Sequence, residues 1–293
     1  MGTVARLAQA CGLFLSMTIS ASGEDAKLGV VAAENFYADI VRQIGGDRVE
    51  VASILNNPNQ DPHLFETTPT IVRQIAAAQI VIFNGAGYDS WMGKLLESAP
   101  RADRTIVAVA ELVNKKEGDN PHLWYEPSTM PTVARSLAGA FSRSDPAHAA
   151  DYAARLQAFI GSLDRVNRKI EEIRAKYAGV AVTSTEPVFG YMASALGLKV
   201  RNERFQTAVM NDTEPSARDI AAFEDDLKEH KVKLLLYNKQ TSTKLTQVML
   251  DVAHRSNVVV VGVTETEPMG VSYQDWMLSQ LEDLQKALVQ PST

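Results

Sequence analysis

The feature that most restricts the fold of this chain is a series of short, β-branched apolar runs that recur along its 293 residues. Because nearly every position in these runs is apolar, both faces of each predicted strand must be buried, which is typical of a parallel sheet. Segments with helical periodicity separate the runs, and this alternation indicates an α/β fold. The predicted strands are residues 28–32, 49–54, 80–83, 105–108, 180–183, 232–237 and 258–263. The predicted helices include residues 34–44, 70–78, 188–195, 216–229 and 242–255.

One segment breaks the alternation. Between residues 145 and 177, apolar residues recur in steps of three and four, and Pro146 suits a first helical turn. A single amphipathic helix of about 33 residues would be roughly 50 Å long, which is enough to span two lobes. We therefore expect an N-terminal lobe at 24–144, a connecting helix at 145–178 and a C-terminal lobe at 179–293. A ligand would bind between the lobes, beyond the carboxyl ends of the strands.

The first 23 residues have the layout of a secretory signal peptide. Arg6 precedes an apolar stretch at 7–19, and small residues follow at 20–23. The stretch is shorter than the roughly 20 residues of a permanent membrane helix, although a buried core helix is the alternative. The only cysteine, Cys11, lies at the start of this stretch rather than after it. We therefore expect removal of residues 1–23, no lipid anchor, a periplasmic location, and a mature chain without disulfides or thiolate ligands.

Charge and motifs exclude several classes of function. The formal net charge is -6 and the basic residues are not clustered, so a nucleic-acid surface is not expected. The sequence contains no nucleophile elbow, zinc-protease helix motif, Walker loop or complete dinucleotide fingerprint. The NGAG sequence at 84–87 indicates a strand-to-helix turn.

Two of the five histidines have nearly identical surroundings. His63 lies in the sequence DPHLFE at 61–66 and His122 in NPHLWYE at 120–126, each after a predicted strand of the first lobe. The proline before each histidine keeps the backbone extended, which helps to fix an imidazole as a metal ligand. The other three histidines, His148, His230 and His254, are interpreted as solvated surface residues.

Carboxylates follow two predicted strands of the second lobe. Glu186 comes after the strand that ends near residue 183, and Glu265 and Glu267 come after the strand that ends at 263. A single loop histidine or glutamate is usually only solvated. Two histidines and two carboxylates together, however, would form an N₂O₂ set that suits Zn²⁺, Mn²⁺ or Fe²⁺ and neutralises the cation's charge.

The chain after residue 23 resembles, over essentially its whole length, the metal-binding solute-binding proteins of ABC transporters, the zinc and manganese group called cluster A-I. The resemblance rests on VVAAENFY at 30–37, DPHLFE at 61–66, PHLW at 121–124, FGY at 189–191, EPS at 214–216 and VTET at 263–266. It implies two α/β lobes, each with a mostly parallel four-stranded sheet, joined by one long rigid helix. It also implies a periplasmic monomer that binds Zn²⁺ or Mn²⁺ between its lobes and delivers the metal to an inner-membrane ABC permease. The family's ligand positions match His63, His122, Glu186 and Glu265.

The sequence departs from the family pattern in two respects, one in a loop and one in the ligand set. The segment 114–119 is short and contains no histidine, whereas many zinc-delivering members carry a histidine-rich loop there. Glu186 is typical of manganese-type members, and Glu265 stands where aspartate is usual, so Glu267 stays an alternative fourth ligand. The His₂Glu₂ set therefore does not favour strict zinc selectivity, although intrinsic affinity still favours Zn²⁺ over Mn²⁺.

We expect a non-enzymatic protein whose metal affinity depends on pH and whose lobes rearrange locally rather than by wide hinge closure. One alternative is a secreted metal-dependent hydrolase, which would hold its metal with three protein ligands and a water. Another is a family member that binds a non-metal solute or acts in adhesion.

Overall fold

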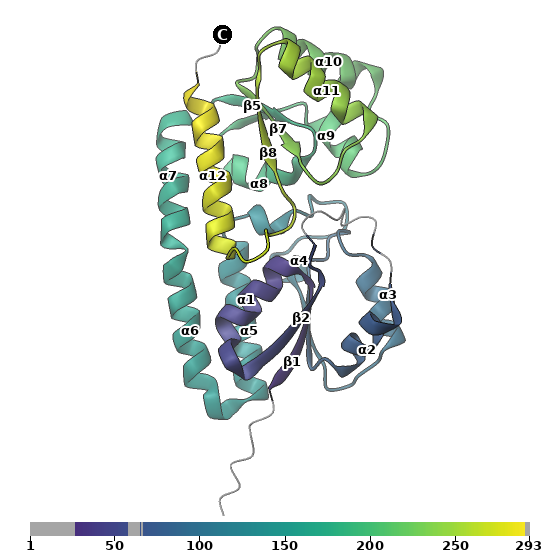
Figure 1. Ribbon diagram of the computed structural model, residues 1–293, viewed down its shortest axis with the longest axis vertical. Coiled ribbons are helices and arrows are strands. Elements are labelled where there is room, and N and C mark those ends of the chain that lie inside the picture. Colours follow the sequence, from purple (N-terminus) through teal and green to yellow (C-terminus); the bar gives the residue numbers. More distant parts are fainter. Residues whose placement is uncertain (1–26, 58–64, 66, 291–293) are drawn as a thin grey trace, which may run out of the picture.

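Two lobes are stacked along the long axis of the computed structural model, which describes residues 27–57, 65 and 67–290 (Figure 1). Each lobe contains a four-stranded sheet, and every strand pair in both sheets is parallel. The first sheet has the order β2-β1-β3-β4 and the second the order β6-β5-β7-β8. The first sheet comprises β1 (Leu28–Glu34), β2 (Val49–Leu55), β3 (Ile80–Phe83) and β4 (Thr105–Ala108). The second comprises β5 (Ala181–Ser184), β6 (Lys199–Arg201), β7 (Leu234–Asn238) and β8 (Val259–Val263). The predicted two-lobe parallel α/β fold is confirmed, and the predicted signal peptide at 1–23 lies outside the described residues.

The two sheets share one strand order, which determines where a ligand can bind. In each sheet the first strand along the chain is internal, with the second strand on one side of it and the third on the other, so the strand order reverses beside it. Ligands in open α/β sheets bind beyond the carboxyl ends of the strands at such a switch point. The sequence analysis missed one strand, β6, because its three residues include two exposed, charged side chains and form no apolar run.

Helices cover both faces of each sheet, which explains the continuous apolar runs. In the first lobe, Val30 and Ala32 of β1 belong to the core with α1 and α5, while Val31 and Ala33 belong to the core with α2 and α3. The covering helices of this lobe are α1 (Asn35–Gly45), α2 (Pro69–Ala77), α3 (Trp91–Ser98), α4 (Val109–Leu112) and α5 (Thr129–Ser144). Those of the second lobe are α8 (Gly190–Ala195), α9 (Glu203–Met210), α10 (Ala217–Lys228), α11 (Lys244–Arg255) and α12 (Tyr273–Val289). The described residues also form the short 3₁₀ helices η1 (Gly46–Arg48), η3 (Leu123–Tyr125), η4 (Pro146–His148) and η5 (Pro187–Phe189).

The segment predicted as one long helix consists of η4 followed by α6 (Ala149–Ser162) and α7 (Asp164–Tyr177). The two α-helices are separated only by Leu163, whose φ of -74° and ψ of -14° are still helical. The Leu163 N–H donates to the Ile160 carbonyl at 3.2 Å, a tightened turn of the 3₁₀ type. In Figure 1, α6 and α7 run one after the other along both lobes, with α12 beside α7. We propose that α6 and α7 together form the rigid connection between residues 24–144 and 179–293.

A buried group of aromatic side chains also connects the lobes, and we call it the interlobe aromatic cluster. Its members are Phe36, Trp124 and Tyr125 from the first lobe and Phe189, Tyr273 and Trp276 from the second. Ring centroids lie 5.9 Å apart for Phe36 and Trp276, and 5.0 Å apart for Tyr125 and Phe189. A hydrogen bond also joins the two lobes within this cluster, since the Tyr273 hydroxyl donates to the Trp124 carbonyl at 2.7 Å. Wide opening of the lobes would expose this apolar surface, so the packing favours local rearrangement at the site.

No helix within the described ranges combines the length and the apolar character needed to cross a membrane.

Candidate metal centre

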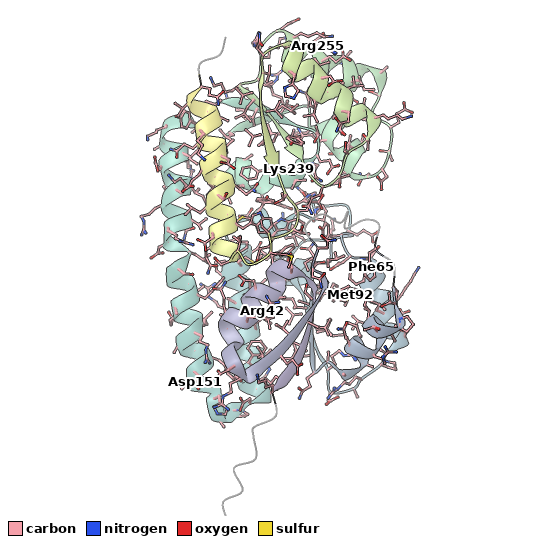
Figure 2. All side chains as sticks on the ribbon, in the orientation of Figure 1. Arg42, Phe65, Met92, Asp151, Lys239 and Arg255 are labelled. Carbon is pink, nitrogen blue, oxygen red and sulfur yellow. The ribbon has the colours of Figure 1, made fainter. Side chains whose placement is uncertain are left out.

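The carboxyl ends of three adjacent strands bring polar side chains of the second lobe together. Glu186 follows β5, Asn238 ends β7, and Glu265 follows β8. Lys239, the neighbour of Asn238, lies where the second lobe approaches the first (Figure 2). From the first lobe, His122 immediately precedes η3. Their relative exposures are 1% for His122, 4% for Glu186 and 0% for Glu265. These side chains are thus held within the interface between the lobes rather than on its rim.

The orientation of the His122 ring is determined by Asn120. The Nδ1 atom lies 2.6 Å from the Asn120 Oδ1 atom, and the backbone N–H of His122 donates to the same oxygen at 3.1 Å. The Asn120 Nδ2 atom donates to the Pro187 carbonyl at 2.7 Å, which identifies Oδ1 as the acceptor that faces His122. The proton therefore resides on Nδ1, and Nε2 is the nitrogen that can bind a metal. This Nε2 atom lies 3.8 Å from Glu265 Oε2.

The two carboxylates are linked through an amide. Asn238 Nδ2 donates to Glu186 Oε2 at 2.9 Å and also to Glu265 Oε1. The side-chain oxygen of Gln240 accepts the backbone N–H groups of Glu265 at 2.5 Å and Thr266 at 3.0 Å. Hydrogen bonds therefore connect the loops after β5, β7 and β8, and Asn238 lies between the two carboxylates.

A second network supports the loop that carries His122. Asp89 accepts the backbone N–H groups of Asn84 at 2.6 Å and Gly85 at 2.8 Å, which closes the turn predicted at 84–87. Gly85 has a φ of 77°, a left-handed conformation that glycine adopts without strain. Asn84 Nδ2 in turn donates to the Pro121 carbonyl at 2.8 Å. The residue before His122 is thus anchored to the end of β3.

Buried acidic groups near this network have perturbed proton affinities. Burial raises the pKa of Glu34, which ends β1, and the negative charge of Asp89 raises it further. Burial likewise raises the pKa of the Tyr88 hydroxyl, with further contributions from Glu265 and Glu34. A cation placed near these groups would oppose both shifts, because it would favour their charged forms.

A cavity of about 380 Å³ opens onto His122 and Glu186. Both lobes line it, and its wall includes three further acidic side chains, Glu117, Asp119 and Asp212. A small cation could approach the buried His122 ring through this cavity.

The structure describes three of the four predicted ligands. His63 lies outside the described residues. The structure places His122 beside Glu265 and connects Glu186 to Glu265 through Asn238. Among residues 27–57, 65 and 67–290, no group of three or more histidine, cysteine or acidic side chains is arranged to hold a metal ion.

Glu267, the alternative fourth ligand, contacts α1 of the first lobe. Its backbone N–H and carbonyl pair with the side-chain amide of Asn35, at 3.2 Å and 2.6 Å. Burial raises the pKa of its carboxyl to about 9, with Asp39 adding to the effect and Arg42 opposing it. Glu267 thus belongs to the contact with α1.

The sequence analysis assigned no role at the site to Asn84, Asn120, Asn238 or Gln240. The sequence carried a signal for Asn238, because this residue ends an apolar strand. Glu186 and Glu265, which were selected, likewise follow apolar strands. Of the three histidines assigned to the surface, His230 and His254 are exposed, and His148 pairs with Asp145 at 2.8 Å.

Comparison with known proteins gives one family and several relatives. The model of the family described as ZnuA, zinc-uptake complex component A, periplasmic, matches residues 30–287. The manganese ABC transporter substrate-binding lipoprotein PsaA of Streptococcus mitis is 25% identical over 293 residues, covering 92% of this chain and 91% of the relative.

Solved structures share the fold. The periplasmic zinc-binding protein TroA of Treponema pallidum superposes with a TM-score of 0.75 at 21% identity, covering 90% of this chain and 100% of that protein. A manganese-bound S38A mutant of a periplasmic metal-binding protein from Candidatus Liberibacter asiaticus has a TM-score of 0.74 at 18% identity, covering 89% and 100%. At these identities the structural likeness concerns the fold alone.

Proposed function

Because the chain belongs to the family of periplasmic zinc-uptake component A proteins, we propose that it captures one divalent transition metal between its lobes and delivers it to an ABC permease for import. The metal is Zn²⁺ or Mn²⁺, the ions named for the relatives described above. The role is that of a solute-binding protein rather than an enzyme, and the metal is its cargo.

The observation that carries this proposal is the buried pair of His122 and Glu265. The Nε2 atom of His122 and the Oε2 atom of Glu265 lie 3.8 Å apart, and both side chains are almost completely buried. Ionisable groups are costly to bury without a compensating charge, and a divalent cation would supply it. We propose His63, His122, Glu186 and Glu265 as the ligands, with His63 completing the set from the segment outside the described residues.

The location follows from the same proposal. We propose that residues 1–23 direct export and that the mature protein acts as a monomer in the periplasm, at the outer face of an inner-membrane permease. Several relatives are named lipoproteins. The position of Cys11 before the end of the apolar stretch favours a free protein in this case.

Elemental analysis tests the proposal. The protein is stripped with a chelator, exposed to equimolar Zn²⁺, Mn²⁺ and Fe²⁺, desalted and analysed by mass spectrometry. We expect about one equivalent of metal in the wild type. His63→Ala and His122→Ala should lose it, and the exposed control His254→Ala should retain it. A wild-type protein that retains no metal would contradict the proposal.

A further inference from the structure

The amide side chain of Asn120 reaches from the first lobe to the second. Asn120 lies two residues before the proposed ligand His122, and its Nδ2 atom donates to the carbonyl of Pro187 at 2.7 Å. Pro187 belongs to the second lobe and directly follows the proposed ligand Glu186. One side chain therefore connects the loop that carries His122 to the loop that carries Glu186.

The orientation of this amide follows from groups whose roles are fixed. The Pro187 carbonyl can only accept a hydrogen bond, and the backbone N–H of His122, 3.1 Å from Asn120 Oδ1, can only donate one. A flipped amide would oppose like groups at both positions. Oδ1 is therefore an acceptor, and it lies 2.6 Å from Nδ1 of His122. The neutral ring must then carry its proton on Nδ1, which leaves Nε2 as the ligand atom, 3.8 Å from Glu265 Oε2.

The FGY sequence at 189–191, which carries part of the family resemblance, receives this loop in the second lobe. The Tyr191 hydroxyl donates to the backbone carbonyl of Asn120 at 2.8 Å. A Cβ atom at Gly190 would lie 3.1 Å from Asn120 Nδ2, so a larger residue would crowd the amide. The second lobe thus contacts both the backbone and the side chain of Asn120, and Gly190 permits the close approach.

We propose that Asn120 is a positioning residue that orients the His122 ring and holds it in place relative to Glu186 across the lobe interface. This inference rests on the proposed function, which makes His122 and Glu186 metal ligands. A hydrogen bond to the second ring nitrogen orients a metal-binding imidazole, and loss of such a bond typically weakens metal affinity about 10- to 100-fold. In this chain the same amide also joins the two loops.

Two substitutions distinguish the contact with the ring from the contact with the other lobe. Asn120→Asp keeps an oxygen that can accept from Nδ1 of His122 but has no N–H for the Pro187 carbonyl. Asn120→Leu has a similar size and loses both contacts. The control is Gln79→Leu, which removes an amide that accepts the backbone N–H of Gly29 at 2.9 Å. Gln79 precedes β3 and so lies at the end of the sheet opposite the site.

Nitrogen-15 NMR of the chelator-treated protein measures the ring tautomer without any metal. At pH 8, where an ordinary imidazole is neutral, His122 should carry its proton on Nδ1 in the wild type, in Asn120→Asp and in the control. Asn120→Leu should lose this fixed tautomer. A wild-type ring with its proton on Nε2, or an unchanged tautomer in Asn120→Leu, would overturn the proposal.

Hydrogen exchange of the same samples measures the contact between the lobes. Segments 119–124 and 187–191 should both exchange faster in Asn120→Asp and Asn120→Leu, because both variants lack the bond to the Pro187 carbonyl. Exchange in the control should match the wild type. Wild-type exchange of both segments in Asn120→Asp would overturn the connection across the interface.

Competition with a fluorescent chelator measures the consequence for Zn²⁺. The dissociation constant should rise about 10- to 100-fold in Asn120→Leu, rise less in Asn120→Asp and stay unchanged in the control. Wild-type affinity in Asn120→Leu would overturn the positioning role. A wild-type protein that binds no Zn²⁺ would instead contradict the proposed function, and the NMR spectra would still show whether Asn120 orients His122.

Discussion

Replacing Glu267 with glutamine should stabilise the metal-free protein against unfolding, and the gain should increase with pH. The Glu267 side chain is 6% exposed, and its Oε2 atom has no hydrogen-bond partner among the described residues. Burial raises its pKa from the ordinary value of 4.5 to about 9, and the nearby charge of Asp39 contributes. At neutral pH the folded protein therefore keeps a proton that the unfolded chain has released.

The sign and the size of the effect follow from proton linkage. Because the pKa of this acid is raised in the folded state, stability is lost as pH rises from about 4.5 toward 9. Each pH unit in this window costs about 1.4 kcal/mol, so the accumulated cost is about 3 kcal/mol at pH 7. Glutamine keeps the shape of the protonated acid and cannot ionise, so Glu267→Gln removes this cost.

Urea unfolding in the presence of a chelator measures the difference. The variant should differ from the wild type by less than about 1 kcal/mol at pH 5, and the difference should grow by about 1.4 kcal/mol per unit up to pH 8. Glu282→Gln, at an exposed position of α12, serves as the control and should show no such slope. The reasoning would be refuted if the free energies of unfolding of Glu267→Gln and wild type differed by the same amount at pH 5 and at pH 8.

Three further predictions concern the site and the lobe interface. Metal affinity should fall between pH 7.5 and pH 5, because His63 and His122 must be neutral to bind the ion; calorimetric titrations that give one affinity across this range would contradict the ligand assignment. Trp276→Ala should lower the free energy of unfolding by about 3–5 kcal/mol in chemical denaturation, since it removes a buried ring of the interlobe aromatic cluster. The exposed control Val289→Ala should change it little, and a small loss in Trp276→Ala would show that the cluster contributes little to stability. Small-angle X-ray scattering should give nearly the same radius of gyration with and without metal, and a large decrease on binding would indicate hinge closure instead.

Much of the fold could be predicted because burial leaves a local pattern in the sequence. Strands β3 and β4 match their predicted ranges residue for residue. For β3 the reason is local, since its apolar run lies between Gln79 and Asn84. The exposed strand β6 has no such pattern and was missed. The segment predicted as one helix at 145–177 begins instead with the 3₁₀ turn η4 and contains a tightened turn at Leu163, and nothing in the apolar spacing indicates either one.

The candidate site was predictable in part. The rule that ligands lie beyond the carboxyl ends of parallel strands selected Glu186 and the segment with Glu265 and Glu267. Spacing alone left the choice between these two glutamates open, because they are two residues apart in one loop. The structure places Glu265 beside His122 and directs Glu267 toward Asp39 and α1. All four ligands, His63, His122, Glu186 and Glu265, remain predictions.

The sequence by itself determined the fold class and the residue types at the site, because apolar periodicity and strand-end position are properties of neighbouring residues along the chain. Only the tertiary structure decided how those residues act together. The amide of Asn238 reaches two carboxylates that lie 52 and 27 residues away in the chain, and the Asn120 amide connects the His122 ring to the other lobe. Such contacts depend on the register of separate strands and on the packing of two lobes, and no local pattern encodes them.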